Sequence, residues 1–425
     1  MITRRRFAAL AGGSAAALAA GRLAMPAIAQ GKPKVVVVGG GAGGATAAKY
    51  IAKDSAGAID VTLVEPAKEF VTCFHSNLYV GGVKKFEEIT HKYDKLAAHG
   101  VKVVHQMASA IDRDKRIVKL ADGTELAYDR LVLSPGIDLK YDSVPGWGRE
   151  HEEAMPHAWK AGPQTKILKA KLDAVKDGGL IVMLAPPNPF RCPPGPYERV
   201  SMMAHALKST GRGKCKIVIV DAKDKFSKQA LFQEGWEKHY PGMIEWLSPS
   251  IHDGVKSVDP KTGTVTTGFE TYKDAALVNV IPAQMAGAIV RDAGLADASG
   301  YCPIDAAAMK SVKDANIFVI GDACIPGDMP KSAFSANSQA KVAAMAIRGE
   351  LVAAKTFPPR YANTCWSMID TDDTIKVGGR YENKEGKITS VEAFISQTAE
   401  ADALRKQTQA ENIGWYAGIT ADIFG

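Results

Sequence analysis

Two short apolar runs, separated by a glycine-rich turn and a segment of small residues, begin the patterned part of the chain. Residues 34–38 contain four consecutive valines, and residues 61–64 form a second apolar run. An uninterrupted apolar run of this length indicates a strand buried on both faces, as in a parallel sheet. Residues 45–54 between the runs have helical spacing. The pattern therefore predicts a strand–helix–strand unit.

The turn between the first strand and this helix, Gly-Gly-Gly-Ala-Gly-Gly, has glycines where a bound dinucleotide requires them. Gly39 makes the tight turn, Gly41 lets the backbone approach a pyrophosphate, and Gly44 permits close packing of the helix, with Ala42 in the same turn. Glu65 ends the second strand, where an acid accepts ribose hydroxyls. The unit therefore predicts a dinucleotide site with the pyrophosphate at the helix N-terminus.

Two later strands end in turns with the same kind of chemistry. Residues 130–133 run into a turn that ends at Gly136, and residues 317–320 run into Gly321-Asp322. Ligands of open α/β sheets lie at the carboxyl ends of the strands. The Gly-Asp turn is similar to the second FAD motif of flavoproteins with two dinucleotide domains, in which the aspartate binds the ribityl chain. FAD is therefore the expected cofactor.

A second unit of the same type is expected between these motifs, with strands at residues 179–184 and 215–221. The segment after its first strand, residues 185–190, is rich in proline and offers few backbone N–H groups to a phosphate. We therefore expect no NAD(P)H site in this unit. A helix is expected at residues 335–354, with its N-terminus near the flavin pyrimidine ring.

The predicted fold class is α/β, with two Rossmann-like dinucleotide-binding domains in a glutathione-reductase-like arrangement and a small C-terminal α+β domain. Its 425 residues, 46% of them hydrophobic, suffice for several cores. The expected divisions are an export signal at 1–30, FAD-binding segments at 31–145 and 281–355, a second domain without a nucleotide fingerprint at 146–280, and an interface domain at 356–425.

The first thirty residues have the features of a twin-arginine export signal. Residues 3–7 contain three arginines, an alanine-rich apolar stretch follows, and Ala27-Ile28-Ala29 offers a cleavage site. The alternative, an uncleaved membrane anchor, needs about 20 strongly apolar residues. We therefore expect a periplasmic protein. Removal of four arginines with the signal lowers the formal charge from +7 to +3, which does not favour nucleic acid as a partner.

The chain has six cysteines and no CxxC pair. This spacing argues against a zinc site and against a c-type haem in this chain, so no metal site is predicted. In an oxidising compartment some cysteines can form disulfides. Packing in the core is the expected role of Cys215, Cys302 and Cys324.

Five segments carry a resemblance to a known family: Val71-Thr72-Cys73-Phe74-His75-Ser76-Asn77, Phe190 to Arg199, Gly321-Asp322-Ala323-Cys324, Pro330 to Ser338 and Asn363-Thr364-Cys365. Across essentially the whole mature chain, the sequence resembles the flavoprotein subunit of flavocytochrome c sulfide dehydrogenase.

The resemblance implies FAD joined through a thioether to Cys73, with Asn77 at the cofactor. It also implies a redox disulfide between Cys192 and Cys365, with Glu198 as an acid/base residue beside it. Sulfide would be the substrate. The chain lacks CxxCH, so the haem that accepts the electrons would belong to a c-type cytochrome partner.

Other roles remain open for these residues. Cys73 can be an ordinary buried cysteine, and a bridge between Cys192 and Cys365 can be purely structural. Glu198 can form an ion pair with a neighbouring arginine, Arg191 or Arg199. Four aromatic residues near the C-terminus can cover the flavin site, dock a partner or pack in the core: Trp366, Trp415, Tyr416 and Phe424.

Three other functions compete with this interpretation. A sulfide:quinone oxidoreductase shares the fold and the cysteine chemistry, but it should have an amphipathic or apolar C-terminal anchor, and residues 396–425 are polar and charged. An NAD(P)H-linked disulfide reductase requires a second GxGxxG and a CxxxxC pair, and the sequence has neither. The third alternative is a non-catalytic flavoprotein that serves as a scaffold for a cytochrome.

Overall fold

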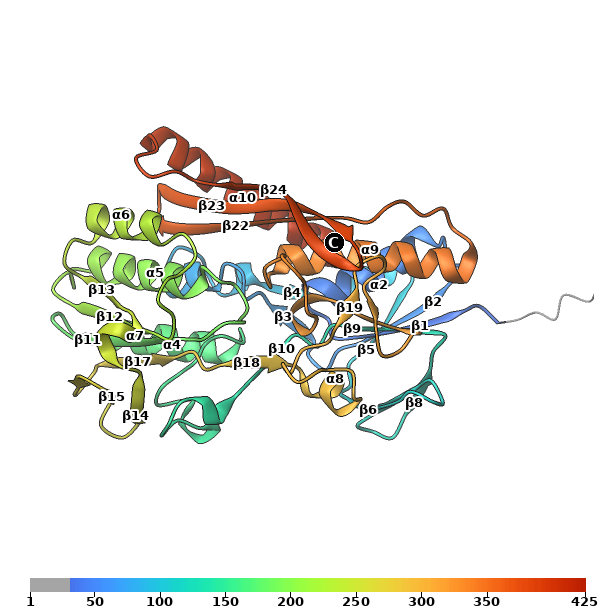
Figure 1. Cartoon of the computed structure of the whole chain (residues 1–425), viewed down its shortest axis with the longest axis horizontal. Coiled ribbons are helices and arrows are strands. Elements are labelled where there is room, and N and C mark those ends of the chain that lie inside the picture. Colours follow the sequence, from blue (N-terminus) through green and yellow to red (C-terminus); the bar gives the residue numbers. More distant parts are fainter. Residues whose placement is uncertain (1–30) are drawn as a thin grey trace, which may run out of the picture. The chain divides into compact units, whose positions relative to one another are not determined.

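A parallel sheet in the order β21-β9-β1-β2-β5 carries the predicted glycine turn at the carboxyl end of its central strand, in a computed structural model that describes residues 31–425 (Figure 1). Two short antiparallel strands extend it beyond β21. The four valines of β1 are buried, as expected for a central strand. The strands are β1 (Lys34–Val38), β2 (Asp60–Val64), β5 (Val101–Val104), β9 (Arg130–Leu133), β19 (Ile304–Asp305), β20 (Lys310–Ser311) and β21 (Ile317–Val319).

Two helices cover this sheet and pack against each other. Helix α2 (Ala42–Asp54) begins in the glycine turn, and α9 (Ala333–Val352) begins at Ser332, whose Oγ accepts a hydrogen bond from Ser335 N at 3.0 Å. A serine cap of this kind fixes where a helix starts. Smaller elements of this part are β3 (Glu69–Val71), α3 (Ser76–Val80), β4 (Thr90–Lys92), β6 (Ala108–Asp112), β7 (Ile117–Leu120), β8 (Glu125–Ala127) and α8 (Ala288–Asp292).

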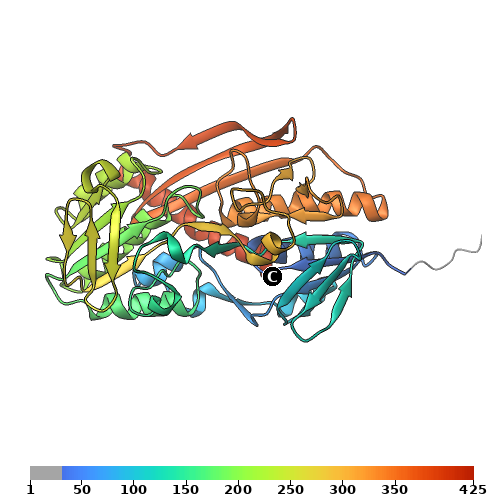
Figure 2. The same ribbon diagram turned by 60° about the horizontal axis from the view of Figure 1, so that its bottom comes forward.

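A second parallel sheet, in the order β13-β12-β11-β17, forms its own hydrophobic core with the surrounding helices. The antiparallel pair β10 (Ile137–Leu139) and β18 (Gln284–Ala286) connects it to the first sheet (Figure 2). Its elements are α4 (Pro163–Ala174), β11 (Leu180–Ala185), α5 (Gly195–Ser209), β12 (Lys216–Asp221), α6 (Gln229–His239), β13 (Ile244–Leu247), α7 (Pro249–His252), β14 (Val255–Asp259), β15 (Thr264–Thr267), β16 (Thr271–Tyr272) and β17 (Leu277–Val280).

The C-terminal region is an antiparallel sheet followed by a long helix, and it contacts both α/β parts of the molecule. Strand β22 (Arg360–Asp370) packs against α9 near its start and against α5 and α6 near its end, as Figure 1 shows. The sheet continues with β23 (Asp373–Lys384) and β24 (Lys387–Ile395), and α10 (Asp402–Phe424) packs on α2 and β23. This region therefore spans the boundary between the two parallel sheets.

The predicted fold class is confirmed, with two parallel sheets and an α+β C-terminal region. The helix expected at residues 335–354 is α9, shifted by two residues. The sheets lie within the predicted segments, but residues 33–425 form one compact unit, so the domain boundaries stay a prediction. The predicted export signal at residues 1–30 lies outside the described residues. Within residues 31–425, no helix is both long and apolar enough to cross a membrane.

Arg405 near the start of α10 ties the C-terminal region to the second α/β part. Its side chain is 5% exposed and forms ion pairs with Asp373 at 3.1 Å and Glu234 at 3.2 Å. Replacement by methionine removes the arginine from the buried Asp373, which keeps only His239 at 2.8 Å, and removal of one partner of a buried pair costs about 3 kcal/mol. Chemical denaturation should show a loss of this size for Arg405→Met.

Arg380 is the control, because its ion pair with Glu392 joins two exposed side chains. Arg380→Met should lower the free energy of unfolding by about 1 kcal/mol at most. Equal effects of the two substitutions would contradict the anchoring role of Arg405.

Candidate active site

A cavity of about 440 Å³ lies at the carboxyl ends of β1, β9 and β21, and we refer to it as the dinucleotide cavity. It collects nearly all of the residues that the sequence assigned to the cofactor. They are Gly39, Gly41, Ala42, Glu65, Cys73, Gly136, Gly321 and Asp322. The first residues of α9, Ala333 and Ala336, complete it. The N-termini of α2 and α9 therefore both reach this cavity, where backbone N–H groups can bind a phosphate or another anionic group.

Glycine is required at two positions of the turn. A Cβ on Gly44 would lie 1.8 Å from the carbonyl oxygen of Gly39, and Gly39 itself has φ +98°. The first requirement is close packing of α2 and the second is a backbone conformation that side chains rarely adopt. Both agree with the predicted roles. Gly44 thus acts by packing beneath the cavity rather than by lining it.

Glu65 and Asp322 occupy two ends of the dinucleotide cavity and differ in their hydrogen bonds. Glu65 accepts from Gly40 N at 2.7 Å and from Ala67 N at 2.9 Å, so its carboxylate stabilises the turn as well as facing the cavity. Among residues 31–425, nothing pairs with the buried Oδ1 of Asp322. A buried acceptor without a donor is costly, so this atom suits a ligand hydroxyl. The phosphate turn and this acceptor together fit FAD.

A second cavity, of about 70 Å³, adjoins the first, and we refer to it as the sulfur pocket. It is lined by Cys192, Cys365 and Glu198, together with Asn77, Arg199, His75 and the aromatic side chains Trp159, Trp366 and Trp415. Five residues line both cavities: Cys73, Phe74, Arg191, Ser332 and Ala333. The volume admits a few species of the size of water, and it lies directly against the dinucleotide cavity.

Cys192 comes from the loop between β11 and α5, and Cys365 from the middle of β22. The Cys192 backbone is left-handed, with φ 58°, and its N–H donates to the Lys331 carbonyl at 2.8 Å. A Cβ on Gly195 would lie 2.9 Å from Cys192 Sγ, so the glycine that begins α5 leaves room for the sulfur. All six cysteines of the described chain are thiols in this structure. The pairing of Cys192 with Cys365 stays a prediction.

Glu198 is buried in the first turn of α5 and is held by two donors. Its Oε2 accepts from Asn77 Nδ2 at 2.8 Å and its Oε1 from Met368 N at 3.0 Å. Burial raises the pKa of Glu198, so the carboxyl group is suited to hold a proton. The alternative that Glu198 forms an ion pair with Arg191 or Arg199 is not what the structure has, since no arginine nitrogen lies within 4.0 Å among the described residues.

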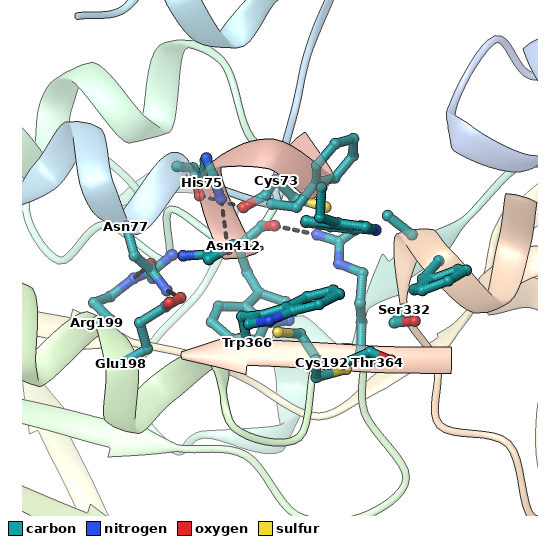
Figure 3. A pocket seen from close by; sticks show the side chains of 18 residues that line it. Cys73, His75, Asn77, Cys192, Glu198, Arg199, Ser332, Thr364, Trp366 and Asn412 are labelled. Atoms are coloured by element: carbon teal, nitrogen blue, oxygen red, sulfur yellow. Dashed lines mark hydrogen bonds between the residues drawn. The ribbon is translucent and has the colours of Figure 1, made fainter. Parts of the chain in front are cut away.

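Asn77 lines the sulfur pocket, where its Nδ2 donates to Glu198, and its expected contact with the cofactor stays a prediction. Its Oδ1 accepts from Arg199 Nε at 3.0 Å. Arg199 is 2% exposed, and its terminal nitrogens donate to the carbonyls of His157 and Ala158. Burial lowers the pKa of Arg199 to about 9. Figure 3 shows Asn77, Glu198 and Arg199 meeting at one end of the pocket.

The C-terminal aromatic residues divide into two groups. Trp366 and Trp415 line the sulfur pocket, with ring centroids 5.2 Å apart, and therefore cover it. Tyr416 and Phe424 are buried core residues, 5% and 4% exposed, so they cannot form a docking surface. The sequence left these roles open because aromatic content alone does not specify which face of β22 or α10 a residue occupies.

Asp221 shows why the second sheet differs from a nucleotide site. It ends β12, where an acid would bind a ribose, but it is fully buried. Its Oδ2 accepts from Tyr197 OH at 2.5 Å and Trp246 Nε1 at 2.9 Å, and its Oδ1 from Lys223 Nζ at 2.6 Å. The carboxylate is therefore occupied by the chain's own donors, which supports the expected lack of an NAD(P)H site.

The remaining cysteines agree with the expectation of packing. Cys215, Cys302 and Cys324 are all buried, and burial raises the pKa of Cys302 and of Cys324 to about 12. A thiol with so high a pKa is a poor nucleophile. Within the described residues, no group of three or more His, Cys, Asp or Glu side chains is arranged so that it could hold a metal ion.

Comparisons with known proteins agree with this geometry. The profile "Sulfide dehydrogenase (flavocytochrome c) flavoprotein chain, central" matches residues 165–282, and "Flavocytochrome c sulphide dehydrogenase, flavin-binding" matches residues 357–424. "Pyridine nucleotide-disulphide oxidoreductase" matches residues 33–172.

Individual relatives point the same way. The flavoprotein chain of sulfide dehydrogenase (flavocytochrome c) from Chlorobaculum thiosulfatiphilum is 60% identical over 47 residues, which are 11% of this chain and 96% of that sequence. The mitochondrial sulfide:quinone oxidoreductase of Dictyostelium discoideum is 23% identical over 73% of this chain and 69% of its own length. The solved sulfide:quinone oxidoreductase of Aquifex aeolicus has the same fold, with a TM-score of 0.71 at 18% identity and 92% of each chain covered.

The fold, the two adjoining cavities and these matches define a sulfide-oxidising flavoprotein of the pyridine nucleotide-disulphide oxidoreductase type. Within that class, the chain belongs to the family of flavoprotein chains of flavocytochrome c sulfide dehydrogenase.

The contact between Gly44 and Gly39 predicts the effect of a single methyl group. Gly44→Ala places a Cβ 1.8 Å from a carbonyl oxygen, so α2 must shift and widen the phosphate-binding turn. The purified variant should contain far less flavin than the wild type, measured as the ratio of visible to ultraviolet absorbance. Gly213→Ala is the control, because a Cβ there meets nothing within 4 Å. Full flavin content in Gly44→Ala would refute the close-packing argument.

Proposed function

We propose that this protein oxidises sulfide to zero-valent sulfur or polysulfide through a disulfide between Cys192 and Cys365, and passes the electrons through FAD to a c-type cytochrome in the periplasm. The observation that carries the proposal is the meeting of Cys192, Cys365 and Glu198 in a pocket that shares a wall with the dinucleotide cavity. The family supports the substrate and the acceptor.

The reaction begins with hydrosulfide attack on one sulfur of the disulfide. The Cys192–Cys365 bond breaks, a new S–S bond forms, and the products are a persulfide on one cysteine and a thiolate on the other. Re-formation of the disulfide then releases one sulfur atom, one proton and two electrons for each hydrosulfide. Bound FAD would supply the two-electron acceptor, which can return electrons one at a time to a haem.

Glu198 serves as the proton acceptor in this scheme. Its buried carboxyl group lines the same pocket as both cysteines, and burial raises its pKa. Because a proton acceptor works best when its pKa is close to the working pH, this shift favours the role. Asn77 and the backbone N–H of Met368 hold the carboxyl group in one orientation.

Cys73 is suited to join the cofactor covalently. It is the only cysteine of the described residues that lines both cavities, so its sulfur lies between the dinucleotide cavity and the redox pair. A cysteine that only packs in the core does not have to lie at the boundary between two cavities. We therefore propose the thioether between Cys73 and FAD that the family resemblance implies.

A second candidate acceptor is a quinone, which the similarity to sulfide:quinone oxidoreductases favours. The export signal predicted at residues 1–30 favours the periplasm, where c-type cytochromes accept electrons. Sulfide-dependent turnover of the wild-type protein, measured once with a c-type cytochrome and once with a water-soluble quinone analogue as the acceptor, separates the two.

Substitution of either cysteine of the proposed pair should abolish sulfide-dependent reduction of the flavin, because neither persulfide nor disulfide can then form. Cys192→Ser and Cys365→Ser are mixed with sulfide under anaerobic conditions and the flavin absorbance is followed, with dithionite to show that the flavin remains reducible. Cys215→Ser is the control, since this cysteine is buried away from the pocket. Wild-type turnover by Cys192→Ser would favour the scaffold alternative.

The covalent link has its own test. Precipitation of the wild-type protein with acid should leave the yellow colour in the pellet, and Cys73→Ser should release it to the supernatant. Mass spectrometry of the peptide that contains Cys73 would then report the added mass of the flavin. Release of colour from the wild type would disprove the thioether without affecting the proposed sulfur chemistry.

A further inference from the structure

A buried lysine from the second α/β part of the molecule contacts the strand that carries Cys365. Lys228 immediately precedes α6 and is 6% exposed. Its Nζ donates to the carbonyl oxygen of Cys365 at 3.1 Å and to Ser367 Oγ at 2.8 Å. Within residues 31–425, no carboxylate oxygen lies within 4.0 Å of this ammonium group. The cation is therefore buried against β22 without an anionic partner of its own.

The backbone at Lys228 is left-handed, with φ 63°. A non-glycine residue in this region costs on the order of 1 kcal/mol, and such strain persists only where the surroundings enforce it. Here the hydrogen bonds to Cys365 and Ser367 do so. In this conformation the long charged side chain of Lys228 points inward, toward β22, and not into water.

A second group is oriented toward the sulfur of Cys365. The Oδ1 of Asn363 accepts from Ser332 Oγ at 2.6 Å and Ser335 Oγ at 3.2 Å, and this fixes the orientation of the amide. Its Nδ2 therefore faces Cys365 Sγ, at 3.5 Å. An N–H donor next to a sulfur stabilises the thiolate, while the protonated thiol can donate to Oδ1 of the same amide at 3.8 Å.

Cys192 has a different environment. Burial raises its pKa well above the usual value, and the neighbouring Cys365, Glu198 and Cys73 raise it further, while Arg191 opposes them. Burial, and to a smaller extent Glu198, also raise the pKa of Cys365, but Asn363, Lys228 and Ser332 all oppose that change. The two sulfurs of the pocket are therefore not equivalent.

We propose that Lys228 is a positioning residue that makes Cys365 the thiolate of the cysteine pair. This inference rests on the proposed redox role of the pair and deepens it. When hydrosulfide breaks the disulfide, the negative charge goes to the better leaving sulfur, Cys365, and the persulfide forms on Cys192. The ammonium group of Lys228 then lies against the segment of β22 that carries the new anion.

The ionisable groups that face this part of β22 come from four elements. Glu198 belongs to α5, Cys192 to the loop before it, Lys228 to the start of α6 and Tyr381 to β23. Burial lowers the pKa of Lys228 to about 8, while Cys365, Glu198 and Cys192 raise it. Lys228 is the cation in this group, so its removal should raise the pKa of Cys365.

The test measures alkylation of each cysteine in the reduced holoprotein, without sulfide. Protein reduced with dithiothreitol and freed of it is exposed to iodoacetamide between pH 6 and pH 10, and each cysteine peptide is quantified by mass spectrometry. In the wild type Cys365 should react at lower pH than Cys192. In Lys228→Met the pH at which alkylation of Cys365 is half-maximal, its midpoint, should rise by on the order of one pH unit. Lys228→Arg should restore most of the wild-type profile.

Lys223→Met is the matched control, because Lys223 is also a buried lysine of the second part but pairs with Asp221 rather than with β22. Its Cys365 profile should equal that of the wild type. An unchanged midpoint in Lys228→Met, or an equal rise in Lys223→Met, would overturn the proposal. So would a lower midpoint for Cys192 than for Cys365 in the wild type, a result that needs no variant to fold.

This experiment is independent of turnover. If sulfide fails to reduce the wild-type flavin while the alkylation profiles behave as expected, the proposed function is wrong and the role of Lys228 stands. If sulfide reduces the flavin but the alkylation profile of Cys365 does not shift in Lys228→Met, the proposed function stands and the role of Lys228 is wrong.

Discussion

Burial of the carboxyl group of Glu198 is the constraint on which the arrangement of the site depends. A charged or titratable group away from water needs hydrogen-bond partners, and each of its partners comes from a different segment. Asn77 lies on α3 in the first α/β part, Met368 lies on the C-terminal strand β22, and Glu198 itself lies in the first turn of α5. The pocket therefore closes only where the two α/β parts and the C-terminal sheet meet.

Two arginines, Arg191 and Arg199, line the same pocket with one acid, Glu198, and the buried Lys228 contacts the strand that carries Cys365. Arg191 pairs with Asp322 at 3.5 Å, while Arg199 and Lys228 are satisfied by carbonyl, amide and hydroxyl oxygens. A small anion that enters such a site finds fixed positive charge in place of the water that it loses. This balance suits a reaction in which each intermediate keeps one negative charge on sulfur. Carbonyl groups carry no net charge, so the carbonyls beside Arg199 and Lys228 leave the positive charge of these side chains unneutralised.

The sequence was most informative where the chemistry is local. The turn from Gly39 to Gly44 and the Gly321-Asp322 pair follow buried strands directly, so strand, turn and ligand site could be predicted together. The family resemblance identified Cys192, Cys365 and Glu198, and the structure collects them in one pocket. The partners of Glu198 could not be predicted, since Asn77 and Met368 lie 121 and 170 residues away. Lys228 had no signal, because a lysine after a loop usually faces water.

Cys192 and Cys365 reach the pocket from the middle of the chain and from one of its last strands. During synthesis the first of these sulfurs leaves the ribosome long before the second, and β22, which packs against α5, α6 and α9, is made after all three helices. A nascent or truncated chain thus carries cofactor-binding elements without a reactive sulfur pair.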